Sequence, residues 1–518
     1  YLRAESAQRR GKIRETEEVG VVRGKTFTRI RIKSDEFRGV STTKDEAISS
    51  PTSSPMSYNF TYEKGVLAGK YGISAATFPS EVTPAFRHAV ASLPEGVVPM
   101  SLHLFRKFDA ATNKRDDRLI VRTTDNEYYE TSVFTVGDTF RKIVNLAAAG
   151  KDCSACYRYN GKDLFLASSE RGFFYTYDGT TLKKIENAPN MTSMCVHAER
   201  IFATVSGEQN KVWFSADFNP ENWKVSGDGA GYIDFDDEGG KVIIKVVKFL
   251  NYVYIFRDFG VERLTAFGAQ TDFSVSKIYT ASARIYPDTI VPLGDRIVFL
   301  TEEGLKCLDG YNVQNIFADL SDFLSSDKRN AVATGMDGKY FLAANMVFPG
   351  DFAVKFLDEV RDQGVYNTNG LAVCDVKKNK MTLLRGMDIR FIKSVNVHTL
   401  SAVYMTFSGV NKHLIGMFSD TGKYFSDKLP RYWTTGYTDL GYPEKQKSVR
   451  NVMLTAHGTV TLGLELDGNK IEYLLKGADL PQKIIVNRAF SKMRVYLKEN
   501  SESGSYTVTP PSITVDLS

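Results

Sequence analysis

The feature that most constrains this fold is a recurring pair of β-rich segments. Each copy has a short apolar run of β-forming residues, a polar turn and a second β-rich run, and successive copies begin 37 to 51 residues apart. One four-stranded propeller blade needs about 40–50 residues. Because a single blade cannot bury both faces of its sheet, the repeat predicts blades packed around an axis, a β-propeller. The runs begin at Leu119, Leu164, Ile201, Tyr252, Ile297 and Tyr340, with a weaker candidate at Leu414.

The composition agrees with a large, mostly β protein. A chain of 518 residues is too long for one compact core, so we expect two or three domains. Hydrophobic residues make up 42% and charged residues 25%, as in ordinary folded proteins. The 33 Phe and 26 Tyr favour strands, and no long stretch keeps the 3.6-residue period of a helix.

Charge and cysteine usage exclude several classes. The 66 basic and 61 acidic residues leave a net charge of +5, which does not indicate a dedicated nucleic-acid binder. Five cysteines in so long a chain do not form the disulfide framework of a secreted protein. The sequence has no apolar run of 18 residues, so we expect no membrane-spanning segment.

Changes in composition and in residue pattern divide the chain into four parts. Residues 1–36 are a charged N-terminal arm, whose second half alternates with a strand period at 26–33 and either pairs with a neighbouring subunit or is a solvated terminus. Residues 37–114 are an extended crossing segment, rich in Ser and Pro. Residues 115–395 carry the propeller, and residues 396–518 read as a C-terminal β-sandwich.

Asp-Gly pairs mark the predicted hairpins. Asp178-Gly179 and Asp309-Gly310 stand between β-rich runs, where a tight turn requires positive φ. We expect these pairs to have a structural role.

Two tryptophans belong to the same structural prediction. Trp213 and Trp223 flank a Ser-Ala-Asp turn that vaguely resembles the Asp-box of sialidase blades, where the residues brace a turn and do no catalysis. We therefore expect both rings to pack within a blade.

One set of residues is a candidate metal site. Cys153 and Cys156 form a CxxC, and Cys195 with His197 could complete four zinc ligands from an adjacent hairpin. Cysteine is also a common small buried hydrophobe, and this second interpretation is the one we favour. We accordingly expect no metal and no cofactor.

The motifs of common enzymes are missing from the sequence. The six histidines form no HxH or HExxH pair, and there is no GxSxG, Walker loop or strand-linked GxGxxG. We therefore assign no catalytic residue and expect no enzyme. A propeller glycosidase, the enzymatic alternative, would need a positioned carboxylate pair or a Tyr nucleophile with an arginine cluster.

Three segments together resemble the tail nozzle proteins of short-tailed bacteriophages, also called tail tubular protein B or packaged-DNA stabilisation protein. The first runs from residues 37–40 through 56–59 to Gly65-Val-Leu-Ala-Gly-Lys-Tyr-Gly72, and the second covers residues 245–264. The third is Trp433-Thr-Thr-Gly436 with the sandwich that follows. The chain departs from the pattern at Ala68 and Gly69, where the family has a basic residue, and residues 1–36 have no counterpart.

This resemblance implies a structural virion protein made in the bacterial cytoplasm. Nozzle proteins form a homohexameric ring that extends the DNA channel, with propellers as outer fins and β-rich tube and platform segments. The implied partners are the tail adaptor or head-to-tail connector, tail fibre or needle proteins, and double-stranded DNA passing without sequence specificity. The alternative is a ligand- or partner-binding propeller of a cell surface or of another part of the tail tip, acting in host recognition.

Overall fold

The fold is built almost entirely from strands. The computed structural model describes residues 18–22, 25–33, 36–37, 39–42, 53–79, 88–90, 92–109, 112–133, 139–226, 229–235, 242–348, 369–397, 400–477, 480–499 and 507–518. Within these ranges the helical elements are three short 3-10 turns. They are η1 (Gln270–Asp272), η2 (Pro287–Thr289) and η3 (Ala318–Asp322).

The first four blades are antiparallel four-stranded sheets that follow one another along the chain. Blade 1 contains β11 (Pro99–Phe105), β14 (Arg118–Thr123), β15 (Glu127–Ser132) and β16 (Arg141–Ala147). Blade 2 contains β17 (Asp152–Tyr159), β18 (Lys162–Ser169), β19 (Phe174–Tyr177) and β20 (Leu182–Ile185). Blade 3 contains β21 (Met191–His197), β22 (Arg200–Val205), β23 (Glu208–Phe214) and β24 (Gly231–Asp234). Blade 4 contains β25 (Ile243–Phe249), β26 (Tyr252–Arg257), β27 (Gly260–Thr265) and β28 (Ser274–Thr280).

Three further blades complete the set in the described part of the chain. Blade 5 contains β29 (Val291–Leu293), β30 (Arg296–Thr301), β31 (Gly304–Leu308) and β32 (Val313–Asn315). Blade 6 contains β33 (Val332–Met336), β34 (Lys339–Ala344), β35 (Gly370–Asp375) and β36 (Lys380–Arg385). Blade 7 contains β37 (Ile389–Val397), β38 (Leu400–Phe407), β39 (Ile415–Ser419), β8 (Gly72–Ala75), β40 (Lys423–Tyr424) and β41 (Asp427–Lys428).

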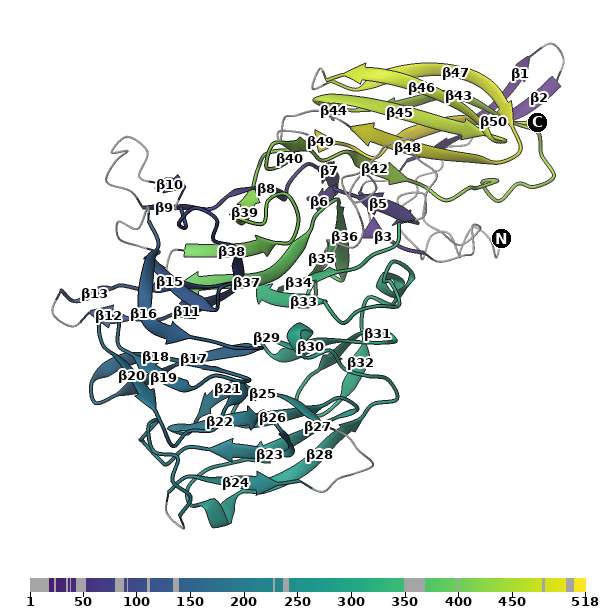
Figure 1. The fold of residues 1–518 in the computed structure, drawn as a ribbon. Coiled ribbons are helices and arrows are strands. Elements are labelled where there is room, and N and C mark those ends of the chain that lie inside the picture. The colour runs from purple at the N-terminus through teal and green to yellow at the C-terminus, as the bar shows by residue number, and fades with distance from the viewer. Residues whose placement is uncertain are drawn as a thin grey trace.

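Apolar clusters between neighbouring blades close the ring. Seven clusters of buried side chains each join two successive blades, and the last one joins blade 7 to blade 1. The first strand of blade 1, β11, accordingly packs on β37 and β38 of blade 7. Figure 1 shows the blades arranged around a common axis. The predicted β-propeller is therefore confirmed, with seven blades in the described residues.

A segment from before blade 1 closes blade 7. Strand β8 pairs antiparallel with β39, and Ile73 also pairs with Tyr424 of β40. The blades thus extend beyond the expected range 115–395. The expected boundary at 114/115 falls inside β13 (Lys114–Arg115), and the boundary at 395/396 falls inside β37.

A β-sandwich stands beside the propeller (Figure 1). One sheet has the order β1 (Glu18–Val22), β2 (Lys25–Ile32), β50 (Ser512–Leu517), β43 (Lys447–Leu454) and β47 (Gln482–Phe490). The other has the order β46 (Asn469–Lys476), β45 (Thr459–Leu466), β48 (Met493–Glu499), β42 (Arg431–Thr434) and β5 (Met56–Tyr58). One buried apolar cluster, which includes Trp433 and Leu464, fills the space between them.

Shorter sheets fill the connections. A four-stranded sheet contains β44 (Ala456–His457), β49 (Thr507–Val508), β7 (Val66–Ala68) and β6 (Thr61–Glu63). Three two-stranded pairs join β9 (Thr77–Pro79) to β10 (His88–Val90), β12 (Phe108–Asp109) to β13, and β3 (Gly39–Val40) to β4 (Ser53–Ser54).

The N-terminal arm is part of the sandwich. The strand predicted at 26–33 is confirmed as β2, which pairs through residues 28–32 with β50 of the same chain. This stretch is therefore not a solvated terminus, and pairing of the arm with a neighbouring subunit stays a prediction. The first part of the arm, residues 1–17, lies outside the described residues.

Residues 56–59 fasten the sandwich to the propeller. Strand β5 pairs with β42 of the sandwich, while Met56 and Tyr58 belong to the apolar cluster of blades 5 and 6. Asn59 follows in a left-handed conformation (φ 61°). Its backbone N–H donates to Leu383 O (2.8 Å), and its side-chain Oδ1 accepts from Arg385 N (2.9 Å) of blade 6. The apolar cluster of blades 5 and 6 therefore reaches the sandwich, where it includes Tyr432 and Tyr496.

Candidate functional site: a polar junction between the first two blades

A buried hydrogen-bonded centre joins the innermost strands of blades 1 and 2. Ser101 and His103 alternate on β11, and Asp152 and Ser154 alternate on β17, so each pair lies on one face of its strand. His103 Nε2 lies 2.7 Å from Asp152 Oδ2, and His103 Nδ1 lies 2.8 Å from Ser154 Oγ. Ser101 Oγ donates to Asp152 Oδ2 at 3.0 Å. The imidazole therefore bridges the two blades.

Asp152 is the acceptor at the middle of this centre. Arg122 Nη1 donates to its Oδ1 (3.1 Å), and Tyr128 Oη donates to its Oδ2 (3.1 Å). Burial alone would raise the pKa of Asp152, but the charge and hydrogen bond of His103 and the charge of Arg122 hold it well below its usual range. Burial, followed by the charge of Asp152, raises the pKa of Tyr128. The carboxylate is thus ionised at neutral pH.

The order Ser154, His103, Asp152 is that of a hydrolase triad, but the surroundings favour a structural clamp. A triad serine must reach a substrate carbonyl, and its carboxylate serves mainly to orient the histidine. Here the side chains of His103 and Asp152 are only 8% and 7% exposed. Besides His103, three further blade 1 side chains donate to Asp152. The centre holds β17 against β11.

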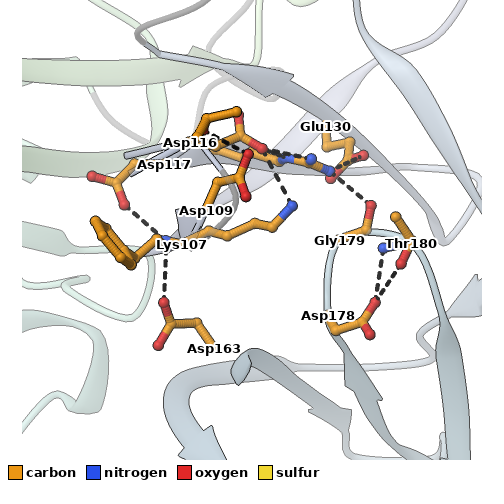
Figure 2. A network of polar contacts seen from close by, with 12 residues as sticks. Lys107, Asp109, Asp116, Asp117, Glu130, Asp163, Asp178, Gly179 and Thr180 are labelled. Carbon is orange, nitrogen blue, oxygen red and sulfur yellow. Dashed lines mark hydrogen bonds and ion pairs between the residues drawn. The ribbon is translucent and has the colours of Figure 1, made fainter. Parts of the chain in front are cut away.

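A second polar network lies between the same two blades. Arg118 on β14 donates through Nη2 to Asp116 Oδ2 (2.7 Å) and through Nη1 to Glu130 Oε1 (2.7 Å). The same Nη1 donates across the blade boundary to the carbonyl of Gly179 (3.0 Å). Tyr177 of blade 2 donates to Glu130 Oε1 in return (3.0 Å). Figure 2 shows Asp116, Glu130 and Gly179 converging here.

The segment after β11 belongs to this second network. The backbone N–H of Lys107 donates to Asp117 Oδ1 (2.8 Å), and that of Phe108 donates to Asp163 Oδ2 of blade 2 (2.7 Å). Figure 2 shows Asp117 and Asp163 on either side of Lys107. Carboxylates thus satisfy backbone donors that have no strand partner.

The predicted Asp-Gly turns also brace neighbouring blades. Asp178 Oδ1 accepts from the backbone N–H of Thr180 and Thr181, and Gly179 has a φ of +96°. Burial would raise the pKa of Asp178, yet these donors and the Lys162 ammonium hold it well below its usual range.

The second Asp-Gly turn repeats this geometry. Asp309 Oδ1 accepts from the backbone N–H of Tyr311 (3.0 Å) and Asn312 (2.8 Å), and Gly310 has a φ of +108°. The carbonyl of Gly310 accepts from Tyr254 Oη of blade 4 (3.0 Å), just as that of Gly179 accepts from blade 1. Each turn therefore positions a carbonyl for the preceding blade.

The two tryptophans differ in burial. Trp223 is 2% exposed, meets Phe174 of blade 2 edge-on at 5.8 Å, and donates from Nε1 to Pro220 O (3.0 Å). Trp213 is only half-buried, on Tyr232 of its own blade, and donates to Glu208 Oε2. Both rings pack against the apolar cluster of blades 2 and 3, Trp223 as a buried member and Trp213 from its partly exposed edge.

The structure does not bring the four candidate zinc ligands together. Cys153 and Cys156 are three residues apart on one strand and so face opposite sides of it. Cys153 Sγ contacts Met191 O of blade 3, whereas Cys156 Sγ contacts Leu104 O of blade 1. Cys195 packs in the cluster of blades 3 and 4, and His197 meets Phe267.

The pKa shifts of these four side chains are caused mainly by burial, which disfavours their charged forms. Burial raises the pKa of Cys153, Cys156 and Cys195, that of Cys195 to about 12, while burial and then the charge of Lys248 lower the pKa of His197. Across the ranges that the structure describes, no three His, Cys, Asp or Glu side chains form a metal-binding group.

The buried centre of His103 and Asp152 was not predicted from the sequence. The only signal was the alternation of polar residues in Ser101-Leu-His103 and Asp152-Cys-Ser154, inside stretches otherwise typical of β-strands. Alternation identifies residues on one face of a strand, but it does not say which other strand that face meets.

Comparisons with known proteins identify no family for this chain. No family model matches the chain, and no curated protein does. Among solved structures, it is similar to the Neurospora crassa Pan2 WD40 domain, with 12% identity, a TM-score of 0.37, and coverage of 67% of this chain and 94% of that one. It is also similar to a structure of BBS1N in complex with ARL6DN, with 9% identity, a TM-score of 0.38, and coverage of 67% and 96%. The chain itself is a β-propeller joined to a β-sandwich, and no helix in its described residues is long and apolar enough to cross a membrane.

Proposed function

We propose that this chain is a structural subunit of a bacteriophage tail, a nozzle that continues the DNA channel, retains packaged DNA and lets it pass on ejection. In this role the chain assembles with copies of itself, binds the tail adaptor and the fibre or needle proteins, and resides in the virion. It has no catalytic residue and needs no cofactor.

The observation that supports the proposal is that one segment of the chain contributes strands to both the propeller and the sandwich. The crossing segment that resembles the nozzle pattern supplies β5 to the sandwich and β8 to blade 7. Arg431 and Glu499 form an ion pair beneath it, with side chains 1% and 0% exposed, and Arg431 Nε donates to Asn59 O (3.1 Å). A conduit under pressure needs such rigid coupling between its wall and its outer parts.

The polar junctions support the same function. Blades 1 and 2 are joined by an ionised buried centre and by Arg118, and the Asp-Gly turns add cross-blade bonds. Groups that a hydrolase would present to substrate are used here to hold blades together. The propeller is therefore suited to act as a rigid outer body.

The proposal is tested by the assembly state of the purified protein. Mass photometry across a range of concentrations, followed by electron microscopy of the largest species, is expected to show a closed ring of six copies with propellers on the outside. A monomer at every concentration, also after addition of the adaptor protein, would contradict the nozzle role. That result would favour the partner-binding propeller instead.

A further inference from the structure

One sheet of the sandwich turns a face away from the propeller. In this sheet β2, β50, β43 and β47 lie side by side, and apolar residues such as Ile30, Val515 and Val452 point into the sandwich core. The residues that alternate with them lie on the opposite face. The other sheet of the sandwich contacts the propeller, since its strands supply Tyr432 and Tyr496 to the cluster of blades 5 and 6. The outward face of β2, β50, β43 and β47 is therefore on the far side of the sandwich, and we call it the distal face.

Cations outnumber carboxylates on the distal face. Arg29 and Arg31 alternate on β2, and Asp516 of β50 lies directly opposite Arg29. Strand β43 contributes Arg450, and β47 contributes Lys483. Among the side chains described on these four strands, Asp516 is the one carboxylate. Four cations therefore face one anion, and a net charge of +3 remains on the described part of the face.

Strand β50 holds three guanidinium groups through their Nε atoms. Arg29 Nε donates to Asp516 Oδ1 (2.8 Å), and Arg450 Nε donates to Asp516 Oδ2. Arg31 Nε donates to Ser512 Oγ (3.0 Å). A planar guanidinium that is held at Nε still has its terminal amino groups for other acceptors. Within the described ranges, both terminal amino groups of Arg31 and Nη2 of Arg450 have no hydrogen-bond partner.

Lys483 extends the cationic surface to the edge of the sheet. It lies opposite Met453 of β43, which in turn lies opposite Ser512 of β50. Neighbouring strands are about 4.7–4.9 Å apart, so the cations from β2 to β47 span about 14 Å. The major groove of B-DNA is about 12 Å wide. A surface of this width reaches the phosphate backbones on both sides of one groove.

The other side chains of the face favour a duplex over a single strand or a lipid surface. Proteins that bind single strands stack the bases on aromatic rings. Phe27 is the one aromatic side chain described on the distal face, and the guanidinium of Arg29 lies over its ring, 5.1 Å from the centroid. A membrane-binding face needs several exposed apolar side chains, whereas Ile485 is the one large apolar side chain described as exposed on these four strands.

We propose that the distal face binds the phosphate backbone of double-stranded DNA, with Arg31, Arg450 and Lys483 as its phosphate contacts. Guanidinium groups match the geometry of phosphate oxygens. Contacts to phosphates carry no sequence information, so the binding is independent of base sequence. The place of this face in the DNA channel rests on the proposed function, whereas the binding of duplex itself does not.

The test is fluorescence anisotropy of a labelled duplex titrated with the full chain, between about 50 and 200 mM salt. Each neutralised phosphate contributes about 0.9 to the slope of log affinity against log salt, so three contacts give a slope of about −2.7 for one face. Arg31→Met and Lys483→Met are each expected to reduce the slope by about one third. Arg171→Met removes an exposed arginine from blade 2 and is expected to leave the slope unchanged.

Three outcomes would overturn the assignment. They are an absence of duplex binding by wild type at about 50 mM salt, an unchanged slope in both variants of the face, and binding to phosphatidylglycerol vesicles without binding to duplex. Lys483 has no hydrogen-bond or ion-pair partner in the described part of the chain, so Lys483→Met is expected to fold even if Arg31→Met does not. Mass photometry of the same samples separates the two proposals. A ring that does not bind duplex refutes the distal face alone, and a monomer that binds duplex refutes the nozzle alone.

Discussion

Replacing Asp152 by Asn tests whether the buried centre of blades 1 and 2 stabilises the propeller through its charge. The amide keeps the shape of the carboxylate but leaves Arg122 buried without a negative partner. Removing one member of a buried ion pair typically costs about 3–5 kcal/mol. The lowered pKa of Asp152 has the same sign, because a carboxyl that is more acidic in the folded state than in the unfolded state stabilises the fold at neutral pH.

The pH dependence gives the sharper test. The pKa of Asp152 is lowered in the folded state, so its contribution is present above the unfolded value, about 4, and is lost as the pH falls below it. We expect urea unfolding to show the full difference between wild type and Asp152→Asn at pH 7. The difference should shrink steadily from about pH 5 downward.

A matched control separates burial from charge removal in general. Asp327 pairs with Arg329 at the surface, and Asp327→Asn is expected to change unfolding far less than Asp152→Asn. The reasoning is refuted if Asp152→Asn costs under about 1 kcal/mol at pH 7, below the range for a broken buried pair, or if its effect is unchanged at pH 3.

Three further predictions follow from burial. Trp223→Ala should lower the free energy of unfolding by about 3–5 kcal/mol, and Trp213→Ala by clearly less, since its side chain is only partly buried. Equal losses in thermal or urea unfolding would contradict this difference in burial. Arg431→Met should lower the free energy of unfolding strongly, because it leaves the buried Glu499 carboxylate without its partner. The double variant Arg431→Met with Glu499→Leu should lower it much less. A double-mutant cycle that shows no coupling between the two sites would exclude this. Because burial lowers the pKa of Lys245 on β25 to about 8, the cost of burying its charge is present below pH 8 and is relieved as the pH rises toward 10; wild type should gain stability over that interval relative to Lys245→Met, and parallel profiles would show that the charge is not buried.

The recurring pairs that predict the propeller each begin in the same strand of a blade. Leu119, Leu164, Ile201, Tyr252, Ile297 and Tyr340 all lie in the second strand of blades 1 to 6. That strand is buried between two neighbours and two adjacent blades, so its composition is the most apolar. The inner and outer strands have partly polar faces, and their signal is weaker for this reason. In blade 7 the second strand is Leu400–Phe407, and the weaker candidate Leu414 immediately precedes the third.

Single strands and turns could likewise be identified from the sequence pattern. Within the predicted sandwich, residues 459–466 alternate in the sequence and form β45, which ends in the Asp467-Gly468 turn, where both residues have positive φ. By contrast, the Asp-Gly turns at 178 and 309 were identified without their contacts. Their carbonyls accept bonds from Arg118 and Tyr254, more than 50 residues away in the sequence.

The sequence by itself determined the β-rich blades, their approximate spacing and their turns, because these depend on the alternation and composition of neighbouring residues. The tertiary structure decided what joins the blades. It placed β8 in blade 7, β2 against β50, His103 against Asp152, and Arg118 against Gly179. These partners are distant in sequence, and the free energy of each contact depends on burial and on charges that only the closed ring brings together.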